Sequence, residues 1–171
     1  MNLPDPLHPA IVHFPIVLIL LGTLIAIAAM FSPRPVMLRI GAIVWALAAA
    51  GAVAATWSGD EDEEEAEHAG AAAKQVFEEH EEWGERSRDA AIITALAAVA
   101  AAVTLKRLPR FSRGAAALTA LISLAASWCV LETGHYGGQL VYHHGVGVGQ
   151  SGQATTGKPA PEKKSRHRDD D

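Results

Sequence analysis

The chain of 171 residues has one cysteine, Cys129, and this scarcity excludes two kinds of protein. A disulfide framework within the chain requires paired cysteines, and attachment of a c-type haem requires a Cys-x-x-Cys-His motif. Charged residues are also scarce, at 19% of the chain, and they are gathered in a few blocks. Because 50% of the residues are hydrophobic, the composition is unlike that of an ordinary soluble domain. It predicts a small integral membrane protein.

Four apolar runs in the sequence predict four transmembrane helices. Each run is close to the roughly 20 residues that a bilayer core requires. Four such runs in a short chain would leave too little polar surface to cover them in a soluble bundle. We therefore expect an all-α integral membrane four-helix bundle over residues 1–149. The spans are expected at about 12–31, 36–57, 88–106 and 114–133.

Lysine and arginine are missing from the first twelve residues and are concentrated in the two short connections between spans. Cytoplasmic loops are the ones that carry an excess of these residues. The sequence therefore predicts that both short connections are cytoplasmic, and that both termini face outward, to the periplasmic side of a bacterial inner membrane. The basic residues of the connections are Arg34, Arg39, Lys106, Arg107, Arg110 and Arg113.

The long loop over residues 58–87 faces outward in this topology and falls into two halves. The first half, SGDEDEEEAEHAG, is dense in acidic residues and is either a solvated segment or a docking patch for a basic soluble partner, such as a periplasmic cytochrome c. The second half has apolar residues at helical spacing. It predicts an amphipathic helix leading into the third span, with His80 and Trp83 on one face.

Seven of the eight histidines fall on the predicted outer side of the membrane. Imidazole is well suited to holding haem iron, zinc or copper near neutral pH. Measured along each helix from its cytoplasmic turn, His13 and His135 rise about 30 to 33 Å and His80 about 39 Å. A haem can span that difference, whereas a tetrahedral zinc site is less tolerant of it. The seven are His8, His13, His68, His80, His135, His143 and His144.

For each of these histidines, binding of a metal or haem has to be weighed against other interpretations. His8, flanked by two prolines, is expected to cap the first helix or to lie at the membrane interface. His13 stands at the start of an apolar run, where an ionisable group is functional by default. His135 follows Gly134, where a glycine cap would end the fourth helix, and it is either a ligand or an interfacial residue. His143 has a histidine neighbour, and one of the two is expected to orient a ligand rather than to bind a metal.

Four motifs carry a resemblance to a known family: LHPAIVHFPIVL, SGDED, HEEWGE and GHYGGQLVYHHGVGV. The chain resembles, over residues 3–149, the membrane family called domain of unknown function 2231. The first and last motifs are the most specific of the four. The resemblance implies kinship with four-helix b-type cytochromes, which include the membrane subunits of hydrogenases and formate dehydrogenases. It therefore implies a redox role associated with haem.

The sequence departs from a two-haem pattern, because the inner halves of all four predicted spans contain no histidine. Met30 and Met37 are the conceivable substitutes near the inner turn, and neither has a partner histidine. At most one haem layer, on the outer side, is therefore expected. Electron transfer would stay on that side or run to a quinone in the membrane.

The leading hypothesis is a membrane electron-transfer component that binds haem b at its periplasmic face. His13 and His135 are the expected axial ligands, with His80 as the competing choice and His8 and His143 as further candidates. The groups expected to tune these ligands through the other ring nitrogen are Asp60, Glu132 and Tyr142.

Two alternatives stay open. One is a zinc- or copper-binding membrane protein that uses His13, His80 and His135 with a carboxylate such as Asp60. The other is a structural subunit without a cofactor, whose histidines only form hydrogen bonds between helices. Homo- or hetero-oligomers are compatible with each of these hypotheses. Catalysis has little support, since nothing resembles a nucleophile with its base. A nucleotide or nucleic-acid role is not expected, because GVGVG is followed by a polar tail over 150–171, which is expected to be disordered.

Overall fold

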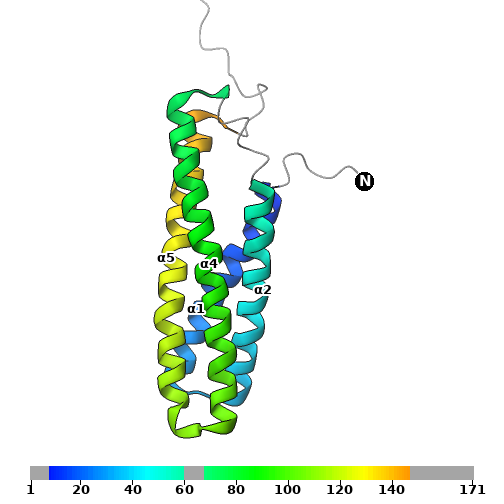
Figure 1. Cartoon of the computed structure of the whole chain (residues 1–171), viewed down its shortest axis with the longest axis vertical. Helices are drawn as coiled ribbons and strands as arrows, with labels where there is room; N and C mark the ends of the chain where they lie inside the picture. The colour runs from blue at the N-terminus through cyan, green and yellow to red at the C-terminus, as the bar shows by residue number, and fades with distance from the viewer. Residues whose placement is uncertain (1–7, 60–67, 147–171) are drawn as a thin grey trace, which may run out of the picture.

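The computed structural model describes residues 8–59 and 68–146, and over these residues the chain is a bundle of long helices (Figure 1). A short 3-10 turn, η2, joins the last two of them at Pro109–Phe111. Four of the helices are long and apolar enough to cross a membrane, so the predicted all-α four-helix membrane bundle is confirmed. The four are α1 (His8–Phe31), α2 (Pro35–Gly59), α4 (Ala71–Arg107) and α5 (Ser112–His144).

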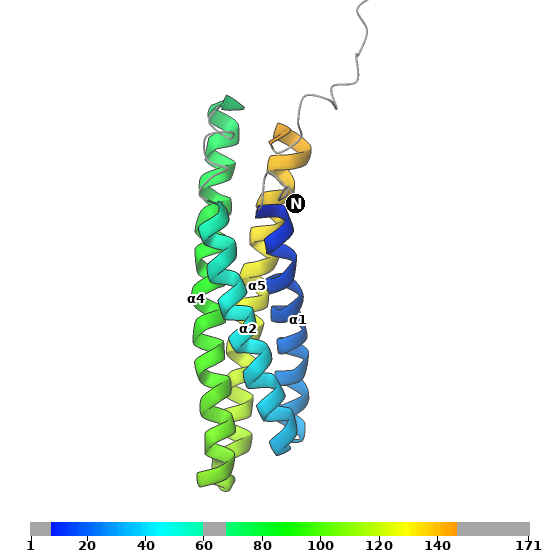
Figure 2. The same cartoon turned by 90° about the vertical axis from the view of Figure 1, so that its right-hand side faces the viewer.

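The helices run antiparallel to their neighbours in sequence, so the described chain begins and ends at the same end of the bundle (Figure 1). We call this the histidine end: α1 begins there at His8, and α5 finishes there at His144. The opposite, basic end holds the α1–α2 connection and the η2 turn. At the histidine end α4 and α5 project beyond α1 and α2 (Figure 2).

The helix α4 is continuous over 37 residues, which confirms that a helix in the acidic loop leads into the third span. At 1.5 Å per residue it is about 55 Å long, well beyond the roughly 30 Å of a bilayer core. Its apolar part begins at Ala90, and the glutamates lie before that position. The first half of α4, including His80, therefore lies outside the hydrocarbon.

The prediction that Gly134 ends the fourth helix is wrong. The helix α5 continues to His144, and Gly145, with φ 71°, is the left-handed residue that caps it. The physical reason is packing: Leu140 on this extension is buried against Phe77 on α4. Burial of that apolar surface outweighs the helix-weakening effect of the glycines along this stretch.

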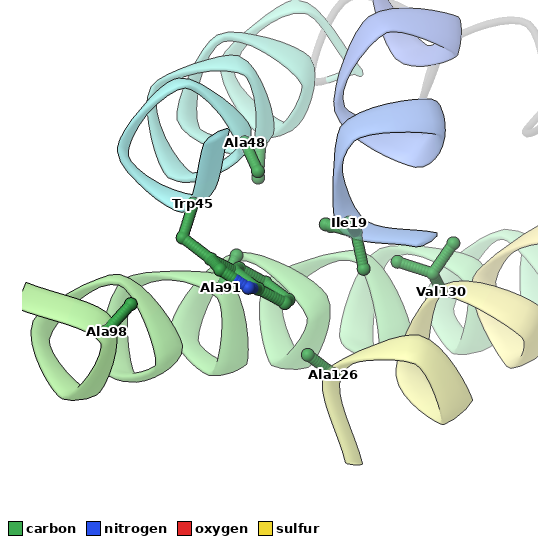
Figure 3. Close-up of a cluster of buried hydrophobic side chains, with 8 residues drawn as sticks. Ile19, Trp45, Ala48, Ala91, Ala98, Ala126 and Val130 are labelled. Atoms are coloured by element: carbon green, nitrogen blue, oxygen red, sulfur yellow. The ribbon is translucent and has the colours of Figure 1, made fainter. Parts of the chain in front are cut away.

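Small residues fill the interior of the bundle and let the helix backbones approach closely. The largest buried side chain in the described part of the chain is Trp45, which packs among alanines, Ile19 and Val130 (Figure 3). A Cβ placed on Gly22 would lie 2.8 Å from Nε1 of Trp45, so this glycine makes room for the indole. Leucines cover the outside of the bundle instead: Leu24, Leu96 and Leu121 are each about two-thirds exposed. An apolar exterior around a small-residue interior is the arrangement that a lipid bilayer favours.

Candidate functional site

A cavity of about 650 Å³ opens at the histidine end. This volume lies within the range of small-molecule and cofactor sites, about 300 to 1,000 Å³. Its deeper wall is apolar and includes Ile16, Ile19 and Val130. Its upper wall carries His8, His80 and a few charged or hydroxyl side chains. All four long helices contribute to this lining, so the cavity exists only when the bundle is assembled.

His80 is held on the upper wall by two features of α5. Its Nδ1 atom lies 2.9 Å from the main-chain oxygen of Thr133 and donates to it. Its ring lies against Gly137, where an added Cβ would come within 3.0 Å of Cε1. Gly137 is four residues after Thr133, on the turn of α5 that the imidazole must cross to reach the carbonyl. Because Gly137 has no side chain, the His80 ring can lie against the backbone of α5 at this point.

His8 is held in the same manner by α2. Its Nδ1 atom lies 3.1 Å from Oγ of Ser58, and a Cβ on Gly59 would come within 3.2 Å of Cε1. The hydroxyl of Ser58 has one proton, which it donates to the carbonyl of Ala55 at 2.9 Å. This arrangement favours His8 as the donor to Ser58, with the imidazole proton on Nδ1.

The two imidazoles are neighbours on the wall of the cavity. Their ring centroids lie 6.2 Å apart, and their planes make an angle of 89°. His80 carries its proton on Nδ1, so its neutral ring has its lone pair on Nε2, and the tautomer of His8 that donates to Ser58 has the same arrangement. No hydrogen bond to either Nε2 occurs within residues 8–59 and 68–146. The two lone pairs do not attract each other. A Lewis acid such as a metal ion between the two imidazoles would accept both of them.

Burial is the main influence on the charge of His80. It lowers the pKa of this imidazole from the ordinary value of 6.5, the hydrogen bond to Thr133 works in the opposite direction, and the neighbouring His8 lowers it further. His80 is therefore neutral at pH 7, which is the form that binds a metal.

A hydroxyl chain below His80 ties α4 to α5. The buried Ser87 lies 3.0 Å from Oγ1 of Thr133, and the Thr133 hydroxyl donates to the carbonyl of Cys129 at 2.9 Å. Thr133 is therefore tied to α4 twice, through its carbonyl, which accepts from His80, and through its hydroxyl, which bonds to that of Ser87.

Arg88 is the positively charged side chain at the cavity wall among the described residues, apart from the histidines. Its guanidinium bonds to Asp89 at 2.9 Å and to Glu85 at 3.3 Å. Glu81 and Glu85 line the same wall. The mouth of the cavity is therefore polar and hydrated, while its floor is apolar.

Other predicted ligands lie apart from this pair. His13 and His135 are both exposed on the outside of the bundle, and the structure does not bring them together. His135 bonds through Nε2 to Gln139 on its own helix at 2.9 Å. His143 and Tyr142 are exposed near the end of α5.

Two of the groups expected to tune a ligand remain to be placed. Glu132 is half-buried and does not line the cavity. Asp60 falls outside the described residues, as do most of the acidic run and the tail over 150–171. Within the described ranges no group of three or more His, Cys, Asp or Glu side chains is arranged to hold a metal ion.

Sequence reasoning expected His8 to cap the first helix or lie at the interface, with ligation as a further candidate, and gave no role to Ser58, Gly59 or Thr133. His8 is the first residue of α1, and Ser58 and Gly59 are the last two of α2. The sequence did contain a signal for the contact of His8 with Ser58 and Gly59, because an antiparallel helix pair places the start of one helix beside the end of the next. The glycines around Gly137 predicted a close approach of the backbone to a flat ligand or another helix, but the contact of Gly137 with His80 depends on the register between α4 and α5.

The fold and site together define a multi-pass four-helix membrane protein with a histidine-lined cavity at one end. The chain belongs to the family described as Predicted membrane protein (DUF2231), whose model matches residues 4–150. No curated protein and no solved structure matches the chain.

Proposed function

We propose that this protein binds one b-type haem between His8 and His80 and serves as an electron-transfer component at the outer face of the membrane. The observation that carries the proposal is the pair of neighbouring imidazoles on the wall of one cavity, each bonded through Nδ1 to a neighbouring helix. Histidines that bind metals usually donate their second nitrogen in this way, which fixes the tautomer and the ring orientation.

The spacing of the two rings fits a shared metal. Metal–imidazole bonds of about 2.0 to 2.1 Å hold two opposed ring centroids about 6 Å apart, and the observed separation is 6.2 Å. Haem iron needs two axial ligands from the protein, whereas a structural zinc needs four and a catalytic zinc three. Because the described residues offer a pair and no group of three, the site favours haem over zinc.

The cavity also suits the body of a haem. Ile16, Ile19 and Val130 give it an apolar floor, as a flat and largely hydrophobic macrocycle requires. The acidic groups of a haem would lie toward the polar mouth, where Arg88 stands. When bound, the haem supplies one-electron chemistry. The residues of the chain hold the ring, set the imidazole tautomers and keep water from the deeper side.

The orientation of the site follows from the distribution of charge. Arg34, Arg39, Arg110 and Arg113 lie at the basic end, and the positive-inside rule assigns that end to the cytoplasm. The histidine end then faces outward, with both termini. In the described part of the chain every histidine lies toward that end, which supports a single haem layer. Electrons would pass to a soluble partner, such as a cytochrome c, or to a quinone, but not across the bilayer through a second haem.

The kinship with four-helix b-type cytochromes that the family resemblance implies supports the same proposal by analogy. Fold kinship does not establish a ligand, so the site geometry has to carry the proposal. The His8–His80 pair differs from the His13–His135 pair expected from height along the helices. The geometry favours the former because those two side chains line one cavity.

The test is an absorption spectrum of the full chain, purified in detergent after expression with ample haem supply. A b-type α-band upon reduction, at about one haem per chain, is the expected result. A colourless protein that contains stoichiometric zinc or copper would replace haem with the metal alternative. A colourless and metal-free protein would overturn the proposal and leave a structural subunit.

A further inference from the structure

The two histidines are held by the same device, repeated on two helix pairs. In each case a residue of the neighbouring helix accepts from Nδ1, and a glycine of that helix lies against the ring. The α1–α2 pair uses Ser58 and Gly59 for His8. The α4–α5 pair uses Thr133 and Gly137 for His80.

The glycine contacts are selective. A Cβ on Gly134 or Gly138 would meet no atom within 4 Å, although both lie within one turn of Gly137. At Gly137 the added atom would stand 3.0 Å from Cε1 and 3.3 Å from Nδ1 of His80. Real Cβ contacts are seldom this short, so the ring would have to shift by a few tenths of an ångström, which disturbs its bond to the Thr133 carbonyl. A ring fixed at its Nδ1 and against a helix backbone has little freedom to rotate about χ2.

We propose that Gly59 and Gly137 are positioning residues that hold the two imidazoles with crossed planes, so that a metal between them has perpendicular axial ligands. This inference rests on the proposed haem function. The rings stand at 89° to each other, and each is held at two points.

Crossed imidazoles leave a spectroscopic signature in a ferric haem. Each imidazole π-system interacts with one of two iron d orbitals. When the planes are parallel, the same orbital is raised twice and the two orbitals separate in energy. When the planes are perpendicular, the two orbitals are raised equally and remain close in energy. The first case gives a rhombic low-spin electron paramagnetic resonance signal, and the second gives a strongly anisotropic one.

The first experiment examines His80 in the full chain before haem is added. Histidine ¹⁵N shifts of protein in lipid nanodiscs report the tautomer, and the His80 resonance is assigned by its loss in His80→Gln. We expect the Nδ1–H tautomer in the wild type and in Gly138→Ala, the matched control. We expect Gly137→Ala to lose this tautomer. Retention of the tautomer in Gly137→Ala would overturn the positioning role.

The second experiment examines the same three proteins loaded with ferric haem. We expect a strongly anisotropic low-spin signal from the wild type and Gly138→Ala. In Gly137→Ala we expect a changed signal and a haem affinity lower by about 10-fold to 100-fold, as is usual when a residue supporting a ligand is altered. Gly59→Ala should act in the same direction through His8.

The outcomes separate the two proposals. Haem bound by two histidines with a rhombic signal would overturn the crossed planes and leave the haem function standing. A protein that binds no haem would overturn both. Equal spectra and affinities for Gly137→Ala and Gly138→Ala would overturn the role of Gly137 alone.

Discussion

The Nδ1 atom of His80 lies 2.9 Å from the main-chain oxygen of Thr133, and this contact joins α4 to α5 beside the cavity. His80 belongs to the polar first half of α4, and Thr133 lies at the end of the apolar part of α5. The bond orients the imidazole and keeps its proton away from the cavity. The behaviour of the site in acid depends on it.

Acid is expected to destabilise the bundle through His80. Burial lowers the pKa of this imidazole in the folded protein, whereas the unfolded chain keeps the ordinary value of 6.5. Below pH 6.5 the unfolded state therefore binds more protons, and stability falls as the pH drops toward the folded-state pKa. Thermal unfolding in detergent between about pH 5 and 8 measures this slope. The His80→Gln variant, which cannot titrate there, should show a shallower slope, and equal slopes would contradict the prediction.

The hydroxyl of Thr23 is expected to stabilise the contact between α1 and α5. It lies 3.1 Å from the carbonyl of Ser123 and 2.8 Å from Oγ of Ser127, besides 2.9 Å from the carbonyl of Ile19 on its own helix. Replacing it in Thr23→Val should cost about 0.6 to 1.7 kcal/mol, the range for hydrogen bonds between membrane helices. The melting temperature in detergent reports the loss.

Thr94→Val is the control for this substitution. Thr94 is also buried and has the same kind of bond to its own helix, to the carbonyl of Ala90 at 2.7 Å, but no bond to another helix is found for it among the described residues. A smaller loss is expected, because no bond between helices is removed. If Thr94→Val lowered the melting temperature as much as Thr23→Val, the interhelical bonds of Thr23 would have no special weight.

Gly22 is expected to tolerate no side chain. A Cβ there would stand 2.8 Å from Nε1 and 2.9 Å from Cε2 of Trp45, which is fully buried. Overpacking of this kind costs about 1 to 3 kcal/mol, so Gly22→Ala should lower the melting temperature. Gly114→Ala is the matched control, since no atom lies within 4 Å of its added Cβ. That variant should be neutral, or more stable by up to about 1 kcal/mol through helix propensity.

The topology can be checked by labelling single cysteines in a Cys129→Ser background. His68 near the histidine end and Arg110 at the basic end are both exposed, and His68→Cys and Arg110→Cys place a thiol at each. A membrane-impermeant maleimide applied to intact cells should label the first and not the second. Permeabilised cells should show both. The reverse pattern in intact cells would contradict the outward assignment of the site.

The fold was predictable from the sequence because its signals are long and local. Uncharged runs of bilayer length predict spans, and helical spacing around Phe77 and His80 predicts the first half of α4. The end of α5 was not predictable in the same way. Gly134 is a strong local stop signal, and the burial of Leu140 against Phe77, which overrides it, depends on packing between helices.

The sequence predicted a histidine site and the end of the bundle at which it lies, but it did not predict which two histidines come together. Height along a helix places His13 and His135 in one layer, yet the direction of a side chain around the helix axis decides whether it faces the cavity. His13 and His135 are exposed, whereas His80 faces inward. The rotation of each helix is set by the small residues at its contacts, which the sequence does not assign to partners.

The most direct measurement is the haem content of four variants, His8→Ala, His80→Ala, His13→Ala and His135→Ala, each purified as a folded, monodisperse protein. The first two should lose the reduced α-band, because each removes one of the two neighbouring imidazoles, whose ring centroids lie 6.2 Å apart. The other two should keep it at about one haem per chain. Loss of haem in His13→Ala and His135→Ala, with retention in His8→Ala and His80→Ala, would contradict the His8–His80 site.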